Sequence, residues 1–177
     1  VPTHPAGMPP NYTVYVDPDS RSVRYITNSN PYRVTLGAPA PFSDSAAVQI
    51  VRDFVLRWHD VFLFRPGIDD FSVYLAQGRD GENIVRMHQM YLGVPVEQMT
   101  YVSLVVPGGE LHFMNGQFMP GILLTVTPKL DPAAAAERAV NAMLPRVVQV
   151  ASPPALIIST GNRGARLAWS TVVQEGG

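Results

Sequence analysis

Residues that could bind a metal or catalyse a reaction are few in this chain of 177 residues, and they are scattered. The sequence holds four histidines, and no two of them have the four-residue spacing that places a zinc-binding pair on one helix face. They are His4, His59, His88 and His112. Cysteine is absent, which excludes disulfides, thiol catalysis and thiolate metal ligands. The sequence therefore predicts no metal site in this chain.

Signatures of acid–base or nucleophilic catalysis are also missing. No Gly-x-Ser-x-Gly sequence marks a serine nucleophile. Asp69 and Asp70 could supply two carboxylates, but neighbouring side chains diverge, so a solvated strand entry is expected. The glycine pairs within 78–81 and 161–164 lie between expected strands and favour hairpin turns over a phosphate loop. We therefore expect a protein that is not an enzyme. The alternative is a small enzyme whose site is assembled from distant residues.

Composition narrows the class of protein further. Hydrophobic residues make up 46% of the chain and charged residues 15%, which predicts a packed core and a sparsely charged surface. A net charge of −1 gives no basic excess for a nucleic-acid partner. Apolar runs are too short to span a bilayer. The start "VPTHPAGMPP" lacks the pattern of a signal peptide and the initiator methionine, which suggests a processed chain.

The first 42 residues are expected to form an irregular lead-in and then a β-hairpin. Four prolines lie within residues 1–10 and leave little periodicity. Two short apolar segments flank Asp17-Pro18-Asp19-Ser20, whose residues favour a tight turn, so a hairpin over 12–26 is predicted. We expect this hairpin to pack against the module that follows. Asn11-Tyr12-Thr13 matches a glycosylation sequon, for which a chance match is the preferred interpretation.

A helix is predicted next, with Ser43 or Asp44 as its N-cap. Apolar residues then recur at steps of three and four, and Arg65-Pro66-Gly67 should end the helix. These apolar residues are Ala47, Ile50, Val51, Phe54, Trp58 and Val61.

Short strands joined by tight turns follow, which predicts an antiparallel meander covered on one face by that helix. The expected strands are FSVYLAQ, NIVRMHQMYL, VEQMTYVSLVV, ELHFM and QFMPGILLTV. Gly93-Val94-Pro95 is expected to turn tightly between two of them. Asn115-Gly116 is a strong signal for a two-residue hairpin turn.

A second, smaller unit is predicted near the C-terminus. Asp131 can cap a helix that starts with Pro132, runs to Leu144 and stops at Pro145. PPALIIST and ARLAWSTVV predict a hairpin, and the tail QEGG should be unstructured. The expected fold class is thus α+β, with two helix-on-antiparallel-sheet, cystatin-like units, the first large and the second small, and an N-terminal β-hairpin. The expected domains are residues 1–42, 43–127 and 128–177.

The middle of the chain resembles the propeptide module of fungalysin and thermolysin precursors. That family has a strand with the pattern Arg-x-x-Gln-x-Tyr-x-Gly-Val-Pro-Val, and this chain has the same residues in order. They are Arg86, Gln89, Tyr91, Gly93, Val94, Pro95 and Val96. The Pro107-Gly108-Gly109 turn and Asn115-Gly116 fit the module too. Glu97-Gln98 departs from the small residue that the family commonly has there.

The C-terminal part, with DPAAAAERAVNAML, ALIIST and ARLAWSTVV, resembles a PepSY domain. The two resemblances cover roughly residues 43–177 and imply the proregion of a secreted or periplasmic zinc metallopeptidase of the thermolysin or fungalysin type. Such a proregion acts as an intramolecular chaperone and inhibitor of the attached catalytic domain until it is cleaved off. The implied partner is the cognate metallopeptidase catalytic domain, which holds the zinc, so no cofactor is expected in this chain. The alternative is a free-standing envelope or extracellular PepSY-like binding or protease-inhibitor module.

The resemblance also implies where the partner is contacted. Gln89 and Tyr91 share a strand face with Val85 and Met87, so they could instead complete the module's own sheet. The residues expected to bind the partner are Gln89, Tyr91, Gly93, Val94, Pro95, Val96 and Trp169. In relatives the end of the proregion enters the protease cleft. The corresponding tail, near which cleavage is expected, is Gln174, Glu175, Gly176 and Gly177.

Overall fold

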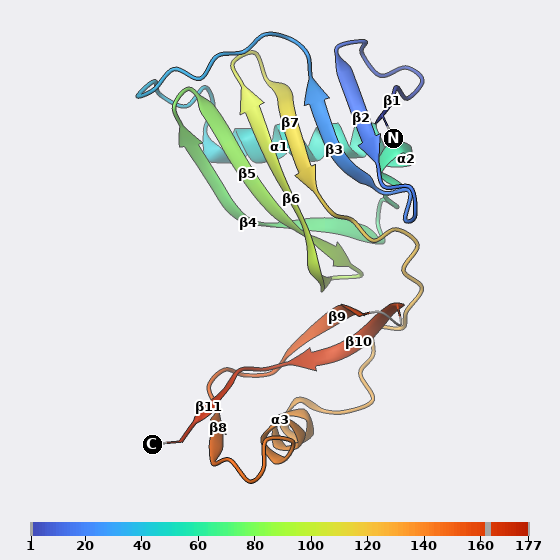
Figure 1. Cartoon of the computed structure of the whole chain (residues 1–177), viewed down its shortest axis with the longest axis vertical. Coiled ribbons are helices and arrows are strands. Elements are labelled where there is room, and N and C mark those ends of the chain that lie inside the picture. The colour runs from blue at the N-terminus through green and yellow to red at the C-terminus, as the bar shows by residue number, and fades with distance from the viewer. Residues whose placement is uncertain (1, 162–163, 177) are drawn as a thin grey trace. The chain divides into compact units, whose positions relative to one another are not determined.

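The chain folds into two compact units of mixed α and β structure, as a computed structural model that describes residues 2–161 and 164–176 shows (Figure 1). The first unit comprises Val1–Gly93 and Gln98–Ile122, and the second comprises Val94–Glu97 and Leu123–Gly177. Residues 1–42 lie entirely within the first unit, and the change to the second falls between Ile122 and Leu123.

The first unit is built on a twisted sheet with the strand order β1-β2-β3-β7-β6-β5-β4. Its strands are β1 (Pro2–Thr3), β2 (Tyr12–Val16), β3 (Val23–Asn28), β4 (Asp69–Arg79), β5 (Glu82–Tyr91), β6 (Val94–Val106) and β7 (Glu110–Gly116). The β4–β5 turn has Asp80 at φ 51° and Gly81 at φ 76°, which confirms the expected hairpin there. A turn at 107–109 joins β6 to β7, also as expected.

Helix α1 (Asp44–Arg57) lies across one face of this sheet (Figure 1). The Ser43 hydroxyl accepts a hydrogen bond from the Ala46 amide, which confirms the expected N-cap. The helix ends earlier than predicted, because Trp58 leaves helical geometry and the short helix α2 (His59–Phe62) follows. This break places Phe62 in the core, edge-on to the Tyr101 ring with 6.0 Å between the centroids.

The core lies between α1 and the sheet. Its largest fully buried side chains include Tyr101, Phe62, Ile26, Met87, Leu111 and Met114. Burying each large apolar side chain contributes about 1.5–3 kcal/mol to folding. The Tyr101 hydroxyl donates to the Val23 carbonyl, and burial raises the pKa of this phenol, so it stays neutral in the core.

The N-terminal residues correct one expectation and confirm another. The lead-in is not irregular throughout, because β1 pairs with β2 and Met8 is 4% exposed. The predicted hairpin is present as β2 and β3, and the Asp17 carboxylate accepts bonds from the backbone amides of Asp19 and Ser20 in its turn. Strand β3 pairs with β7, so this hairpin extends the sheet of the first unit.

Asn115-Gly116 forms no hairpin turn, contrary to the prediction. Both residues end β7, where they pair with Val102 and Tyr101 of β6. A Cβ at Gly116 would lie 2.0 Å from the Thr100 carbonyl oxygen and 2.6 Å from the Tyr101 ring, so the glycine permits close approach and does not make a turn. The following residues, 117–127, do not form the expected strand.

The second unit contains α3 (Pro132–Asn141), β8 (Val148–Val150), β9 (Ala155–Gly161), β10 (Gly164–Ser170) and β11 (Val173–Glu175). Asp131 accepts a bond from the Ala134 amide at 2.9 Å, which confirms this N-cap, although the helix ends three residues before Leu144. Strands β9 and β10 form the expected antiparallel hairpin, whose residues 162 and 163 lie outside the described part. Val96 of β6 pairs with Ile158 of β9 in parallel.

Candidate functional site

The turn between β5 and β6 lies at Leu92 and Gly93, earlier in the chain than predicted. Leu92 has φ 47° and Gly93 has φ 80°, the positive values of a two-residue hairpin turn. Val94 and Pro95 therefore begin β6 and do not form the turn. The Leu92 amide donates to the Ile68 carbonyl at 2.8 Å, which ties the turn to the start of β4.

A shallow groove of about 480 Å³ lies beside this turn in the first unit. Its lining includes three apolar side chains that are exposed to solvent: Leu56 (46%), Ile68 (39%) and Leu92 (46%). Phe64, which is almost fully buried, and Pro66 also line it. We call this surface the Leu92 groove. Exposed large apolar side chains that gather around one hollow are typical of surfaces that bind another protein.

An ion pair with a buried carboxylate lies at the Leu92 groove, because Asp69 lines the groove and pairs with Arg65. Arg65 binds Asp69 through two contacts, Nε to Oδ2 at 2.9 Å and Nη2 to Oδ1 at 3.1 Å, and donates to the Ile122 carbonyl at 3.1 Å. Its guanidinium lies 5.6 Å from the centre of the Tyr91 ring. The hydrogen bond to Asp69 raises the pKa of Arg65, so the guanidinium stays charged.

This pair corrects the expectation that both carboxylates at 69–70 are solvated. Asp69 is 3% exposed and fully paired, whereas Asp70 stays exposed. Sequence reasoning missed it, although an arginine four residues before the aspartate could have indicated it. Two bonds in this geometry fix the backbone at the entry to β4, since Asp69 also accepts from the Arg65 amide at 3.0 Å.

Gln89 and Tyr91 share one face of β5, as the period-two pattern predicts, and the structure shows that this face is buried. Gln89 is 0% exposed and Tyr91 is 5% exposed. The Gln89 amide donates to the Met119 carbonyl at 2.9 Å and accepts from the Met119 amide at 2.8 Å. In this structure both residues serve the first unit itself, which is the structural alternative that the sequence left open.

Val94, Pro95 and Val96 lie in the second unit. Val94 is 8% exposed and Val96 is 1% exposed. Beyond them, the Glu97 carboxylate accepts a hydrogen bond from the Ser159 hydroxyl at 2.9 Å. The backbone carbonyl of Glu97 accepts one from the Thr160 hydroxyl at 3.2 Å. The first residues of β6 thus lie beside β9 in the second unit, where Val96 pairs with Ile158.

Trp169 lines a second groove, of about 670 Å³, in the second unit. Its indole Nε1 donates to the Leu130 carbonyl at 2.8 Å, which fixes the ring beside the entry to α3. Lys129 and Arg138 contribute two cations to this lining, together with the apolar Leu156.

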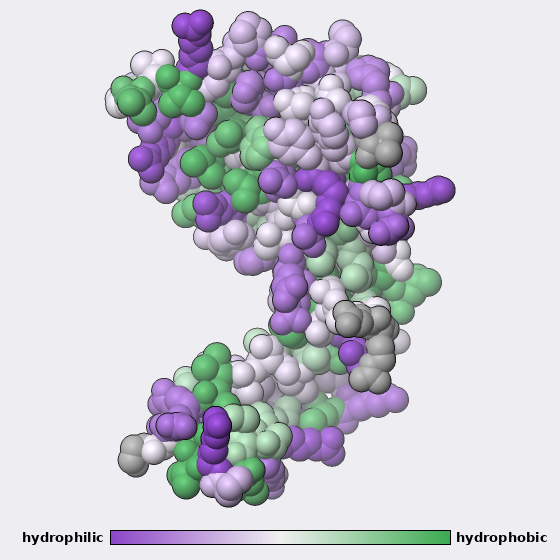
Figure 2. Space-filling view, viewed as in Figure 1, coloured by the Kyte–Doolittle hydropathy of each residue, from purple (hydrophilic) through white to green (hydrophobic). Residues whose placement is uncertain are grey.

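The second unit buries few large apolar side chains and exposes several. Its buried hydrophobic residues among those described are Val94, Val96, Ala135 and Ile158. Its most exposed ones are Leu123 (86%), Val147 (78%), Leu144 (67%) and Val172 (60%). Figure 2 shows apolar residues on the visible surface of this unit. A unit of this kind has apolar area left over for a partner.

The tail is not unstructured as predicted. Gln174 and Glu175 are exposed, but they belong to β11 and pair with Gln149 and Val148 of β8. The Gly176 amide donates to the Val147 carbonyl at 3.0 Å. Gly177, the last of the expected tail residues, lies outside the described residues.

The histidines have different neighbours. His88 stacks on Tyr74 with 4.2 Å between ring centroids, and His59 contacts Asp60 at 3.1 Å. Within residues 2–161 and 164–176, no three His, Asp or Glu side chains are grouped so as to hold a metal ion. No helix in this described part is long and apolar enough to cross a membrane.

Solved structures include folds that are similar to this chain. No protein-family model matches this chain, and no curated protein matches it. Among solved structures, the chain is similar to the Bacillus megaterium YpeB C-terminal domain, with a TM-score of 0.45 and 12% identity, over 93% of this chain and 72% of that chain. Values at this level assign neither a family nor a function to the chain.

Proposed function

We propose that this chain is a non-catalytic binding module that acts as the proregion of a secreted or periplasmic zinc metallopeptidase of the thermolysin or fungalysin type. It binds the attached catalytic domain, assists its folding and inhibits it until cleavage near the C-terminal tail. The zinc belongs to that catalytic domain. The cystatin-like description of the two units belongs to the same proposal, as do the domain bounds 43–127 and 128–177.

The observation that carries the proposal is the state of Leu92. Its side chain is 46% exposed, lines an apolar groove and sits at φ 47°. A left-handed backbone costs a leucine about 1–2 kcal/mol, and asparagine or glycine avoids much of this cost. An apolar, exposed and strained residue at a turn is explained if its side chain is needed by a partner. The turn includes Gly93, the first residue of the Gly-Val-Pro-Val segment that carries the family resemblance, and Leu92 precedes that segment.

A second support is the exposed apolar surface of the second unit, which includes Val147 and Val172. A tether to the catalytic domain would raise the effective concentration of both surfaces to about the millimolar range. Modest contacts therefore suffice for inhibition while the chain is attached. Cleavage removes this advantage and allows release.

One observation favours the alternative of a free-standing PepSY-like binding module. The tail from Val173 to Glu175 is paired with β8, whereas a cleavage segment works best as an unpaired chain. The coding sequence after Gly177 distinguishes the two proposed functions. Coding sequence that continues beyond Gly177 into a His-Glu-x-x-His catalytic domain fits only the proregion.

The proposal is tested by adding residues 1–177 to a refolding thermolysin-type catalytic domain, ideally the one encoded downstream. We expect a higher refolding yield and slow, tight inhibition. Leu92→Asn should weaken inhibition about tenfold, because a leucine side chain contributes about 1.5–3 kcal/mol when buried. The matched control is Leu36→Asn, since Leu36 is 84% exposed and outside the groove. Absence of binding and of protection would refute the proregion function.

A further inference from the structure

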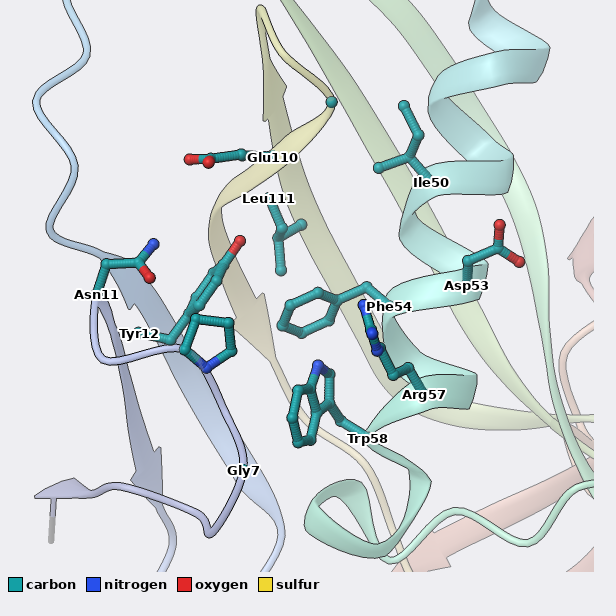
Figure 3. Close-up of a pocket in the computed structure, with 12 residues that line it drawn as sticks. Gly7, Asn11, Tyr12, Ile50, Asp53, Phe54, Arg57, Trp58, Glu110 and Leu111 are labelled. Carbon is teal, nitrogen blue, oxygen red and sulfur yellow. The ribbon is translucent and has the colours of Figure 1, made fainter.

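A pocket of about 470 Å³ opens in the first unit between α1, the β6–β7 turn and the segment before β2 (Figure 3). Its wall is aromatic: Tyr12 and Phe54 lie 5.4 Å apart between ring centroids, and Trp58 completes the wall below them. Tyr12 is 7% exposed and Leu111, behind it, is 1% exposed. A volume of this size suits a small organic molecule or one or two residues of a peptide.

Two hydrogen-bond donors face this pocket without an acceptor. In Figure 3 the guanidinium of Arg57 and the indole nitrogen of Trp58 both lie beside the Phe54 ring. Neither side chain has a hydrogen-bond or ion-pair partner among the described residues. Arg57 and Trp58 are neighbours at the end of α1, so the helix itself brings the two donors together.

Two carboxylates, Glu110 and Asp53, also line the pocket, and both point away from the Phe54 ring in Figure 3. The Glu110 carboxylate accepts from the side-chain amides of Asn28 at 3.1 Å and Asn30 at 3.0 Å. The Asp53 carboxylate accepts from Gln49 at 2.7 Å and points away from Phe54 in Figure 3. The polar groups beside the aromatic wall are therefore the Arg57 and Trp58 donors, and a guanidinium forms its strongest hydrogen bonds with a carboxylate.

We propose that this pocket binds a carboxylate with an apolar body. The carboxylate accepts from the Arg57 guanidinium and the Trp58 indole N–H, and the body packs against Tyr12 and Phe54. Such a group occurs in free aryl or alkyl carboxylic acids and at a peptide C-terminus with an apolar last residue. The site lies within the first unit and is separate from the Leu92 groove, so it is independent of the proregion proposal.

The test uses 4-phenylbutyrate and the two tryptophan indole N–H signals in a proton–nitrogen NMR spectrum of the whole chain. Trp58→Phe assigns the signals. We expect saturable shifts of the Trp58 signal and none of the Trp169 signal. The neutral 4-phenylbutanol and the cationic 4-phenylbutylamine, which have the same body, should bind at least tenfold more weakly.

Arg57→Gln should weaken 4-phenylbutyrate about tenfold, the effect of losing one charge-assisted hydrogen bond. Arg86→Gln is the matched control, because Arg86 is an exposed arginine of the same unit that does not line the pocket. Arg57 is exposed, so its variant should keep the remaining spectrum unchanged. Equal binding by Arg57→Gln, or binding of the alcohol or amine as tight as that of the acid, would overturn the proposal.

A second arm separates the two sources of carboxylate. Gly-Gly-Ala-Phe with a free C-terminus is compared with its C-terminal amide and with 4-phenylbutyrate. Tighter binding of the free peptide than of 4-phenylbutyrate supports a peptide terminus as the ligand, and the reverse supports a free acid. An amide that binds as tightly as the free peptide contradicts a carboxylate site.

Discussion

The side chain of Gln89 forms two hydrogen bonds with the backbone of one residue, Met119. The distances are 2.9 Å to its carbonyl and 2.8 Å from its amide. This arrangement replaces the strand pairing that the segment after β7 lacks, since residues 117–127 form no strand. Gln89→Leu removes both bonds and leaves two backbone groups of Met119 without partners.

We expect Gln89→Leu to lower the free energy of unfolding by about 2–4 kcal/mol, because each unpaired buried group costs about 1–3 kcal/mol. Urea denaturation measures this change. Gln77→Ala is the control, because Gln77 is exposed on β4, and it should have little effect. A loss below about 0.5 kcal/mol for Gln89→Leu would show that the surroundings supply other partners.

Arg65→Leu should be more damaging than the loss of an ordinary surface arginine. It leaves the Asp69 carboxylate, which is 3% exposed, without its two bonds from the guanidinium. Removing one partner of a buried pair costs about 3–5 kcal/mol. Thermal or urea unfolding measures the loss. Arg24→Leu is the comparison, since it breaks the contact with Asp17, whose carboxylate is less buried than that of Asp69, and equal losses in the two variants would contradict a buried Asp69 carboxylate.

Gly116→Ala should destabilise the first unit although alanine suits a strand better than glycine. The added Cβ would lie 2.0 Å from the Thr100 carbonyl oxygen, so β6 and β7 must separate locally. Overpacking of this kind costs about 1–3 kcal/mol. Gly161→Ala is the control, because its Cβ would meet only the end of the Arg166 side chain, at 3.5 Å. A Gly116→Ala protein of unchanged melting temperature would contradict the close approach.

Leu92→Asn should raise the stability of the free chain while it weakens partner binding. Asparagine tolerates the positive φ of 47° at this position, and the leucine is 46% exposed in the free chain, so the substitution loses only part of a side chain's burial. We expect a gain of about 1 kcal/mol. Urea unfolding of the isolated chain measures it. A clear loss would mean that Leu92 already packs within the first unit.

The link between Asp80 and the loop at Gly37 should depend on pH. The Gly37 amide donates to the Asp80 carboxylate at 2.9 Å, and this bond, followed by the contact with Arg79, lowers the pKa of Asp80. Because the pKa of Asp80 is lowered in the folded state, the contribution of its hydrogen bond to folding stability is complete above the ordinary aspartate pKa. It is lost as the pH falls through the lower folded value.

The measurement is the amide chemical shift and exchange rate of Gly37 between neutral and acidic pH. We expect protection at neutral pH and its loss only below the ordinary range of aspartate. Asp80→Asn should remove this transition. A transition at or above the ordinary aspartate pKa would contradict the lowered value.

Local patterns in the sequence determined much of the secondary structure. Ser43 and Asp131 cap their helices because a short polar side chain can reach the first free backbone amides whatever surrounds it. The alternation along β5 predicted that Val85, Met87 and Gln89 share one face, because strand geometry alone sets that period, and the structure shows that this face is buried. Asp80-Gly81 forms its turn because both residues tolerate positive φ.

Only the tertiary structure decided which contacts are made by residues whose partners are distant in the chain. Gly116 permits contact with Thr100 and makes no turn, and Gln89 meets Met119 thirty positions away. The pocket at Trp58 draws on three separate segments, so no spacing in the sequence could indicate it. Local propensity depends on a few neighbouring residues, whereas close approach, burial and shared pockets depend on which strands and helices pack together.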